Sequence, residues 1–501
     1  MKYRKTIIVE LLILLSIHCF RTVLAQQDNW PQFRGPNCCG IADENAKPPV
    51  ELNEKTLLWK TALPIGHSSP CIWEDNIFLT AFVKEKSELQ TICIDRITGD
   101  IKWKKSIFPE KIERYHAISN AAQTSPATDG ERVYVYFGSY GILCYSVEGL
   151  LIWDYKINVH PHHWGVATSP TLYKDMLILS RDIRDELYLL ALNKKNGETI
   201  WKADLVDLKP FLTTSWATPI VYKDQIVLHR LGEIAAYSSS DGHRIWSIPI
   251  QTNGTSTPII HKGIIYIGTW HNVSEKEARA NLPHYRDFSR LLQEFDANDD
   301  GLVQKDELPD SLYLSVRPEI SDSKIPGADV TVSMLMGSLD KDKNGAFDRS
   351  EWQNTIDWTS SFYQDAGLIA INPQGEGELP LDNLIWRELE KVPEVPSPIC
   401  CNGYVYMCKN GGILTCMDAQ NGEILYRENI TAKGPYFASP VAANGRIYIS
   451  SGKGMITTIK ASDKLEILAQ NDLKEKIFAS PAIVDNTIYI RTTQHLSLIH
   501  I

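Results

Sequence analysis

Two acidic stretches carry the residues best suited to chemistry. Residues 296–307 read DANDDGLVQKDE, and residues 340–351 read DKDKNGAFDRSE. Both stretches place oxygen-bearing side chains at the first, third and fifth positions, a glycine at the sixth and a glutamate at the twelfth. Proteins bind calcium through six to eight oxygen atoms in flexible geometry, and a loop with this spacing supplies them. The spacing therefore predicts two calcium sites.

Each predicted site draws on six positions of its loop. The seventh residue contributes its backbone carbonyl, the ninth acts through water, and the twelfth binds through both carboxylate oxygens. Gly301 and Gly345 permit the sharp turn, and Val303 and Phe347 are expected to join the loops through a short β contact. The predicted ligands are Asp296, Asn298, Asp300, Leu302, Gln304, Glu307, Asp340, Asp342, Asn344, Ala346, Asp348 and Glu351.

The alternative is that an acidic surface loop matches the pattern by chance. Two complete matches argue against this, because apolar residues at helical spacing flank both, over 282–295 and 330–339. The stretch from 271 to 366 therefore indicates a helical module containing a pair of EF-hands.

A repeated β unit surrounds this module. The stretch Ser169–Trp201 opens with Ser-Pro, contains apolar residues at every second position and closes on a tryptophan. Alternation of this kind, interrupted by turn residues, predicts three or four strands that cannot bury their apolar faces alone. The opening recurs at Ser69-Pro70, Ser125-Pro126, Thr218-Pro219, Thr257-Pro258, Ser397-Pro398, Ser439-Pro440 and Ser480-Pro481.

The closing residue recurs as often as the opening. It is found as Trp59, Trp103, Trp153, Trp201, Trp246, Trp386 and Tyr426, with Leu468 in the copy that lacks an aromatic residue. Eight copies, most of them about 40–55 residues apart, predict an all-β fold, an eight-bladed β-propeller of four-stranded blades.

The two ends of the repeat indicate how the ring closes. Trp59 precedes the first opening, whereas the eighth copy ends without a closing strand. We expect residues 57–59 to supply that strand, which removes free sheet edges. Residues 26–56 form a lead-in, which we expect to pack across one face of the ring.

The helical module interrupts the fifth blade. This blade opens at Thr257, breaks off before His271, resumes at Gly367 and closes at Trp386. The predicted organisation is therefore a signal peptide over 1–25, the lead-in and the first part of the propeller over 26–270, the EF-hand insert over 271–366, and the rest of the propeller over 367–501.

The amino terminus predicts export. Basic residues precede an apolar run over 7–20, and Val23-Leu24-Ala25 suits signal-peptidase cleavage after Ala25. A membrane anchor is the alternative, but Glu10 and His18 interrupt the run, which is shorter than the roughly 20 apolar residues of a span. We expect a bacterial protein exported through the Sec route, periplasmic or secreted, with no membrane span after cleavage.

The net charge and the predicted export together limit the classes of function that the chain can have. The net charge of −10 becomes −13 without residues 1–25, which carry four basic residues and one acidic residue. An acidic chain without basic clusters argues against nucleic-acid binding. Calcium is abundant outside the cytoplasm, so sites with a Kd of about 10⁻⁴–10⁻³ M suffice there and a structural role is expected for the ion.

Nine cysteines follow the signal peptide, and an odd number cannot all pair within one chain. Cys93, Cys144 and Cys416 share one repeat position and are interpreted as small buried apolar residues. The adjacent pairs Cys38-Cys39 and Cys400-Cys401 could form strained disulfides, but successive strand residues such as the second pair face opposite ways.

One face of the ring collects cationic and aromatic residues. The segment before each opening and the segment after each second strand must lie on that face, next to the channel. This arrangement favours either a ligand pocket or ordinary loop tips with packed tryptophans. The candidate cofactor-binding residues are Arg181, Trp216, His163, Trp164, Trp270 and His271, and further residues on this face are His67, His229, Arg230, Lys409, Lys453 and Arg491. The insert leaves the ring at His271, so we expect it to cap or flank the channel mouth.

The chain resembles the PQQ-like (pyrroloquinoline-quinone-type) β-propeller repeat family, and in particular exported bacterial members with a helical calcium insert. The resemblance is carried by the segments 94–103 (IDRITGDIKW), 29–36 (NWPQFRGP), 367–373 (GLIAINP), 409–414 (KNGGIL) and 434–440 (GPYFASP). It implies the propeller fold, and it implies one of two functions. Members include scaffolds similar to BamB, the outer-membrane assembly propeller, and quinone-dependent alcohol dehydrogenases.

The two functions differ in what the channel must hold. Dehydrogenases of this type bind the quinone and calcium with an Asp base and Glu and Asn ligands, a set that is not matched here, so no catalytic residue is assigned. The favoured hypothesis is an exported, calcium-binding scaffold whose partners are calcium and either envelope proteins or a small ligand at the channel mouth. The alternative is a PQQ-dependent alcohol-type dehydrogenase.

Overall fold

A computed structural model describes residues 29–160, 162, 164–183, 186–206, 215–270, 282–316, 330–365 and 367–500. The predicted signal peptide lies outside these residues. No helix among them is both long and apolar enough to cross a bilayer.

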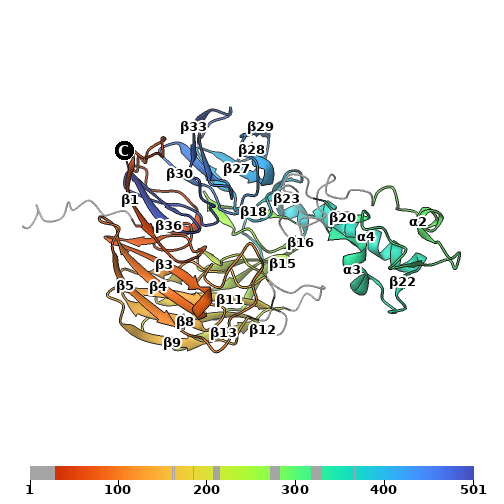
Figure 1. Ribbon diagram of the computed structural model, residues 1–501, viewed down its shortest axis with the longest axis horizontal. Helices are drawn as coiled ribbons and strands as arrows, with labels where there is room; N and C mark the ends of the chain where they lie inside the picture. Colours follow the sequence, from red (N-terminus) through yellow and green to blue (C-terminus); the bar gives the residue numbers. More distant parts are fainter. Residues whose placement is uncertain are drawn as a thin grey trace, which may run out of the picture.

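Eight four-stranded sheets form a ring, as the repeat predicts, and Figure 1 shows their arrangement. In each blade the strand named first below lies innermost, next to the channel. The first three blades contain β2 (Cys71–Trp73), β3 (Asn76–Val83), β4 (Glu88–Asp95) and β5 (Ile101–Ile107); β6 (Ala127–Thr128), β7 (Arg132–Phe137), β8 (Gly141–Ser146) and β9 (Leu151–Lys156); and β10 (Thr171–Tyr173), β11 (Met176–Ile183), β12 (Glu186–Asn193) and β13 (Thr199–Asp204).

The next two blades surround the insertion point. The fourth contains β14 (Ile220–Tyr222), β15 (Gln225–Ser238) and β16 (Arg244–Asn253), with β24 (Gly377–Glu378) beside β16. The fifth contains β17 (Ile259–His261), β18 (Ile264–Thr269), β23 (Gly367–Ile371) and β25 (Leu384–Glu388).

The last three blades lead to the end of the chain. The sixth contains β26 (Ile399–Cys401), β27 (Tyr404–Lys409), β28 (Ile413–Asp418) and β29 (Ile424–Asn429), and the seventh contains β30 (Val441–Ala443), β31 (Arg446–Ser450), β32 (Met455–Lys460) and β33 (Ile467–Asp472). The eighth contains β34 (Ala482–Val484), β35 (Thr487–Arg491), β36 (His495–His500) and β1 (Leu57–Ala62). Short 3-10 turns are η1 (Pro36–Cys38), η2 (Lys84–Lys86), η5 (Leu381–Asn383) and η6 (Asn410–Gly412).

The ring closes through the strand that precedes its first blade. β1 pairs antiparallel with β36, and Trp59 lies opposite Leu498. This confirms the expected closure, and it removes the open edge that the eighth sheet would otherwise present.

The Ser/Thr-Pro openings form a closed circle of hydrogen bonds. The backbone N–H of each opening residue donates to the side-chain hydroxyl of the next blade's opening residue, at 2.9–3.1 Å, and Ser480 donates to Ser69 to complete the circle. Buried backbone N–H groups need an acceptor. A hydroxyl is therefore required at this position in every blade, and threonine serves as well as serine.

The closing tryptophans join neighbouring blades. The indole N–H of Trp103 donates to the carbonyl of Val147 at 2.8 Å, and that of Trp153 donates to Lys194 at 3.2 Å. The glycine turn of the next blade lies against each ring, because a Cβ on Gly197 would come within 2.7 Å of Trp153. Cys93, Cys144 and Cys416, opposite the closing aromatic residues, are fully buried, as predicted.

The fourth blade departs from this pattern. β24 lies in the segment between β23 and β25 of the fifth blade, and it pairs parallel with β16 of the fourth blade at Trp246. Trp246 is consequently fully buried, and its indole donates to Gln225 within its own blade at 3.0 Å. An extra strand thus covers the outer edge where the insert joins the ring.

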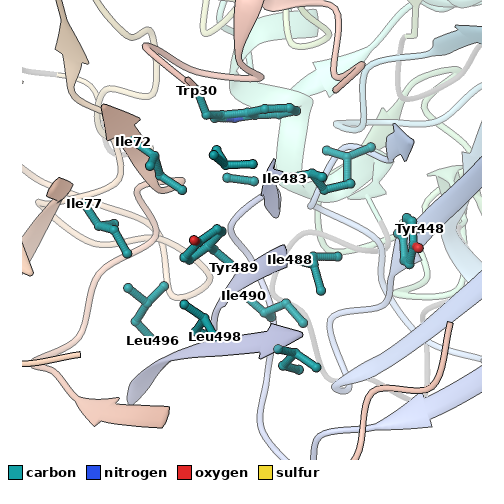
Figure 2. Close-up of a cluster of buried hydrophobic side chains, with 14 of the residues drawn as sticks. Trp30, Ile72, Ile77, Tyr448, Ile483, Ile488, Tyr489, Ile490, Leu496 and Leu498 are labelled. Atoms are coloured by element: carbon teal, nitrogen blue, oxygen red, sulfur yellow. The ribbon is translucent and has the colours of Figure 1, made fainter. Parts of the chain in front are cut away.

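The lead-in crosses one end of the channel and contacts every blade. Trp30 pairs with Ile72 and covers the core between the first and eighth blades (Figure 2). The rest of the lead-in contacts the second to the eighth blades in turn. In the order of the blades, these contacts join Pro31 to Thr128, Gln32 to Leu172, η1 to β14 and β17, Arg34 to Pro398, Ala42 to Ala442 and Lys47 to Asn486. The expectation that this segment packs across one face is confirmed.

The described part of the excursion between β18 and β23 contains three helices and its own apolar core. The helices are α2 (Phe288–Phe295), α3 (Val332–Leu339) and α4 (Arg349–Asp365), and the short strands are β19 (Val303–Gln304), β20 (Tyr313–Ser315), β21 (Val330–Thr331) and β22 (Ala346–Phe347). α2 begins later than the periodicity from 282 suggests, because Asp287 caps it by accepting from the N–H of Ser289 at 3.0 Å. α3 likewise begins after β21, capped by Thr331.

This excursion projects outward from the ring (Figure 1). Its core gathers side chains such as Leu291, Val303 and Trp352, separate from the cores of the blades. α4 contacts β16 of the fourth blade. Of the two expected placements, the module therefore flanks the ring instead of capping the channel.

Candidate functional site

The two acidic loops lie side by side. β19 and β22 pair antiparallel, with Val303 opposite Phe347. This is the β contact expected from the eighth position of each loop. Gly301 and Gly345 have φ values of 81° and 85°, and a Cβ on either would meet no atom within 4 Å. Glycine is therefore needed here for the left-handed backbone and not for space.

The second loop brings three carboxylates together. One carboxylate oxygen each of Asp340, Asp342 and Glu351 lies within 4.8 Å of the others, and among the described residues this is the one such group. Asp340 and Glu351 are buried, and Asp340 Oδ1 is buried without a hydrogen-bond partner. Buried carboxylates of like charge are costly unless a cation or donors compensate them. These residues could hold a metal ion.

Backbone amides hold these carboxylates in place. Glu351 Oε1 accepts from the N–H of Lys341 at 2.6 Å, and Asp340 Oδ2 accepts from Gly345 at 2.8 Å. Asp342 Oδ1 accepts from the N–H of Asn344 at 3.0 Å. The loop thus fixes the three carboxylates, while Asp340 Oδ1 keeps its lone pairs.

The first loop is similar in backbone but different in its side-chain contacts. Glu307 accepts from the N–H groups of Ala297 and Gln304, at 3.0 and 2.9 Å. Asp300 Oδ2 accepts from the amides of both Asn298 and Gln304, at 3.0 and 2.7 Å. In the second loop Asp342 Oδ2 accepts one such bond, from the side-chain amide of Asn344 at 3.0 Å, so Asp300 carries one amide bond more than Asp342.

The candidate residues of the channel mouth are mostly engaged in structural bonds. Arg181 is buried and donates from Nε to Glu186 and from Nη1 to the Tyr136 hydroxyl, at 2.7 and 2.9 Å, while Nη2 donates to the carbonyl of Asn158 at 2.7 Å. All three guanidinium nitrogens therefore have protein acceptors.

Two of the aromatic candidates, Trp164 and Trp216, lie near each other between the second, third and fourth blades. Trp164 stacks on His116 with ring centroids 3.8 Å apart, and Trp216 donates to the carbonyl of Gly165 at 3.0 Å. Trp270 is buried. The candidates His163 and His271 lie outside the described residues.

Other residues predicted on this face also contact neighbouring elements. Arg230 forms ion pairs with Asp182 and Glu233, and His229 contacts Ser256 and Thr252 through its two ring nitrogens. Arg491 is fully buried, and burial lowers its pKa to about 9. Arg230 and His229 are thus held by contacts within the protein.

Two further buried groups lie near this face. Glu113 accepts from the N–H of Val166 at 3.1 Å, its Oε1 has no partner among the described residues, and burial raises its pKa to about 8. His160 is buried, and burial lowers its pKa to about 3. Both lie around Gly138, whose missing side chain makes room for the Glu113 carboxyl. Glu113 is a single residue in an irregular segment, so only the structure reveals it.

The family model described as the outer membrane protein assembly factor BamB matches residues 92–303 and 409–500 of the chain. No curated protein matches the sequence. Among solved structures, BamB from Moraxella catarrhalis is 10% identical with a TM-score of 0.52, over 89% of this chain and 99% of that one.

Two dehydrogenases have similar folds. A europium-containing methanol dehydrogenase is 10% identical with a TM-score of 0.55, over 95% of this chain and 98% of that one. Quinohemoprotein alcohol dehydrogenase from Comamonas testosteroni is 12% identical with a TM-score of 0.52, over 96% of this chain and 81% of that one. At this identity the likeness shows the fold alone.

Proposed function

The chain belongs to the family of the outer membrane protein assembly factor BamB, and we propose that it is an exported, calcium-binding propeller that serves as a binding or assembly scaffold in the cell envelope. The observation that carries the calcium part is the second loop, where the Asp340 Oδ1 atom is buried without a partner beside two further carboxylates. A calcium ion would neutralise this group.

The ligand set of each loop matches calcium in chemistry. All proposed ligands are oxygens, from Asp296, Asn298, Asp300, Leu302, Gln304 and Glu307 in the first loop and Asp340, Asp342, Asn344, Ala346, Asp348 and Glu351 in the second. More carboxylates in such a loop raise calcium affinity. The second loop offers four carboxylates and the first offers three, so the second is the tighter site.

Isothermal titration calorimetry with calcium tests this assignment. We expect two binding events, and Glu351→Gln removes the tighter one while Glu307→Gln removes the weaker one, because each variant loses the bidentate carboxylate. Glu466→Gln, on the propeller, is the matched control and leaves both events unchanged. Absence of calcium binding, or binding unaffected by the double variant, would refute the proposal.

The scaffold part is supported by how the channel is built. The lead-in crosses one end of it, and Arg34 there is fully buried and donates to the carbonyl of Pro398 at 2.9 Å. The candidate cofactor residue Arg181 is held by three protein acceptors. These contacts favour a rigid ring with exposed surfaces over a channel that admits a large cofactor.

The quinone alternative is tested by reconstitution. Because each nitrogen of the buried Arg181 guanidinium already donates to a protein acceptor, the described residues do not fit a quinone carboxylate at that position, and no catalytic step is derived from them. Incubation with pyrroloquinoline quinone and calcium should therefore produce neither a bound-quinone absorbance nor alcohol-dependent dye reduction. Either signal would replace the scaffold by a dehydrogenase, whereas recovery of envelope proteins by crosslinking in cells would support the scaffold.

A further inference from the structure

A surface cavity of about 310 Å³ lies between the second and third blades. It is formed by the ends of β9, β12 and β13 and by the segment that follows β9. Its lining residues are Tyr155, Lys156, Ile157, Asn158, Glu186, Leu187, Tyr188, Lys202 and Asp204. The volume is at the small end of the range for ligand pockets, about 300–1,000 Å³, so it suits one small molecule.

The buried Arg181 fixes the inner side of this cavity. Glu186 accepts from Arg181 Nε at 2.7 Å and from the Asn158 side-chain amide, and Arg181 Nη2 also donates to the carbonyl of Asn158. Arg181 is 1% exposed. The donors on Glu186 lower its pKa, although burial alone would raise it. The inner side therefore presents a carboxylate and an amide in fixed positions.

Of the two tyrosines that line the cavity, Tyr188 is already covered by a cation, and the lining residue Lys156 lies over the ring of Tyr140 beside it. Lys202 Nζ lies 3.8 Å from the centroid of the Tyr188 ring, and Lys156 Nζ lies 3.0 Å from that of Tyr140. A neutral sugar would need such ring faces for stacking. The rim is therefore less suited to a sugar than to a ligand that uses the charges.

Two charges of opposite sign at the rim have no ion-pair partner within the described chain. They are Lys202 and Asp204, both exposed and both on β13, whereas Lys156 pairs with Asp154 at 3.3 Å. Residues two apart on a strand face the same side, with Cα atoms about 6–7 Å apart. Their charged ends can therefore bracket a molecule that carries both a carboxylate and an ammonium group.

We propose that this cavity is a binding site for a small zwitterion of the α-amino-acid class. The ligand carboxylate pairs with Lys202, and its ammonium group pairs with Asp204 and faces the fixed Glu186 carboxylate. Ile157 and Leu187 provide apolar surface for an aliphatic side chain of moderate size. The site is independent of the acidic loops and of the scaffold role, because none of its residues belongs to either.

Titration with L-leucine, followed by saturation-transfer NMR and calorimetry, tests the proposal on the full protein. N-acetyl-leucine retains only the negative charge, and leucinamide retains only the positive charge. We expect saturable binding of leucine and at least about ten-fold weaker binding of both derivatives, because each loses one ion pair. Equal binding of all three compounds, or no saturable binding of leucine at millimolar concentrations, would overturn the proposal.

Substitutions at the rim provide the second readout. Lys202→Gln and Asp204→Asn are both at exposed positions, so the fold should tolerate them, and each should weaken leucine binding at least about ten-fold. Lys174→Gln, at the opposite face of the same blade, is the matched control and leaves binding unchanged. Unchanged affinity in both rim variants would show that the ligand does not use these charges, and the assignment would fail.

Discussion

Glu113 shows how one buried side chain can make the stability of the ring depend on pH. Burial raises its pKa to about 8, so the folded protein keeps the carboxyl protonated at pH values where the unfolded chain, with a pKa near about 4.3, is ionised. The unfolded state therefore binds fewer protons between about pH 4 and 8, and stability falls as pH rises through this window.

Glu113→Gln removes this titration while keeping an oxygen acceptor for the N–H of Val166. We expect the variant to gain stability over the wild type as pH increases from 5 to 8, by an amount on the order of a few kcal/mol. Urea unfolding at both pH values measures the difference. Burial lowers the pKa values of His67, His160 and His229, so these histidines make the stability of the ring fall as pH decreases. Only the difference in stability between the variant and the wild type therefore isolates Glu113. A difference that is the same at pH 5 and pH 8 would contradict the expectation.

Glycine turns provide a second prediction at this scale. Gly197 has a φ of 76°, and a Cβ there would come within 2.7 Å of the Trp153 ring. Gly403 has a φ of 84°, but a Cβ there would meet nothing within 4 Å. Gly403→Ala should cost only the left-handed backbone, about 1–2 kcal/mol, whereas Gly197→Ala adds a clash of about 1–3 kcal/mol. Chemical denaturation of both variants checks the order, and equal losses would mean that the tryptophan moves freely.

At the scale of elements, the circle of hydroxyls joins the innermost strands. Ser480 accepts from the N–H of Ser439 at 2.9 Å and donates its own N–H to Ser69 at 3.1 Å. Ser480→Ala leaves the buried N–H of Ser439 without an acceptor, which should cost about 1–3 kcal/mol. Ser480→Thr keeps the hydroxyl, as Thr218 does in the fourth blade, and should be close to the wild type. Denaturant unfolding of the two variants tests this, and equal destabilisation would show that size and not the hydroxyl matters.

The fifth blade tolerates the insertion because the inserted residues leave the sheet between two strands, β18 and β23, that pair with each other. β18 and β23 pair directly, with Thr269 opposite Gly367, although about a hundred residues separate them. The Thr269 hydroxyl donates to the carbonyl of Gly367 at 2.7 Å and accepts its N–H at 2.8 Å. These bonds hold the two strands in register at the point where the excursion begins, so the fifth blade needs no contribution from the insert.

At the scale of the whole molecule, the insert should respond to calcium without the ring. Its apolar core, around Leu291 and Trp352, is separate from the blade cores, and the proposed ligands belong to it alone. Chelation of calcium should therefore increase hydrogen exchange within residues 282–365 and leave the blades protected, since local unfolding follows cooperative units. Hydrogen-exchange mass spectrometry with and without chelator measures this. Equal deprotection of the blades would show that the two parts unfold together.

Periodic patterns made most of the fold predictable. Eight Ser/Thr-Pro openings and their closing residues give the number of blades, and the position of Trp59 gives the closure by β1, because one repeat must be completed by the other end of the chain. The spacing of glycine and carboxylates likewise places the two acidic loops and their pairing. These features are local in the sequence or occur several times, so each copy supports the interpretation of the others.

Contacts that occur once could not be predicted in this way. The pairing of β24 with β16, the buried Glu113 and the cavity at Lys202 each bring together segments with no shared period. The candidate Arg181 has the residue type expected of a ligand-binding cation, but burial beside Glu186 and Tyr136 commits its donors to the protein. The repeats and the spacing within each acidic loop can be recognised in the sequence alone, and they determine the ring and its acidic loops. Which side chains remain available to a ligand is decided only by tertiary packing, because burial and hydrogen bonding depend on residues that are distant in sequence.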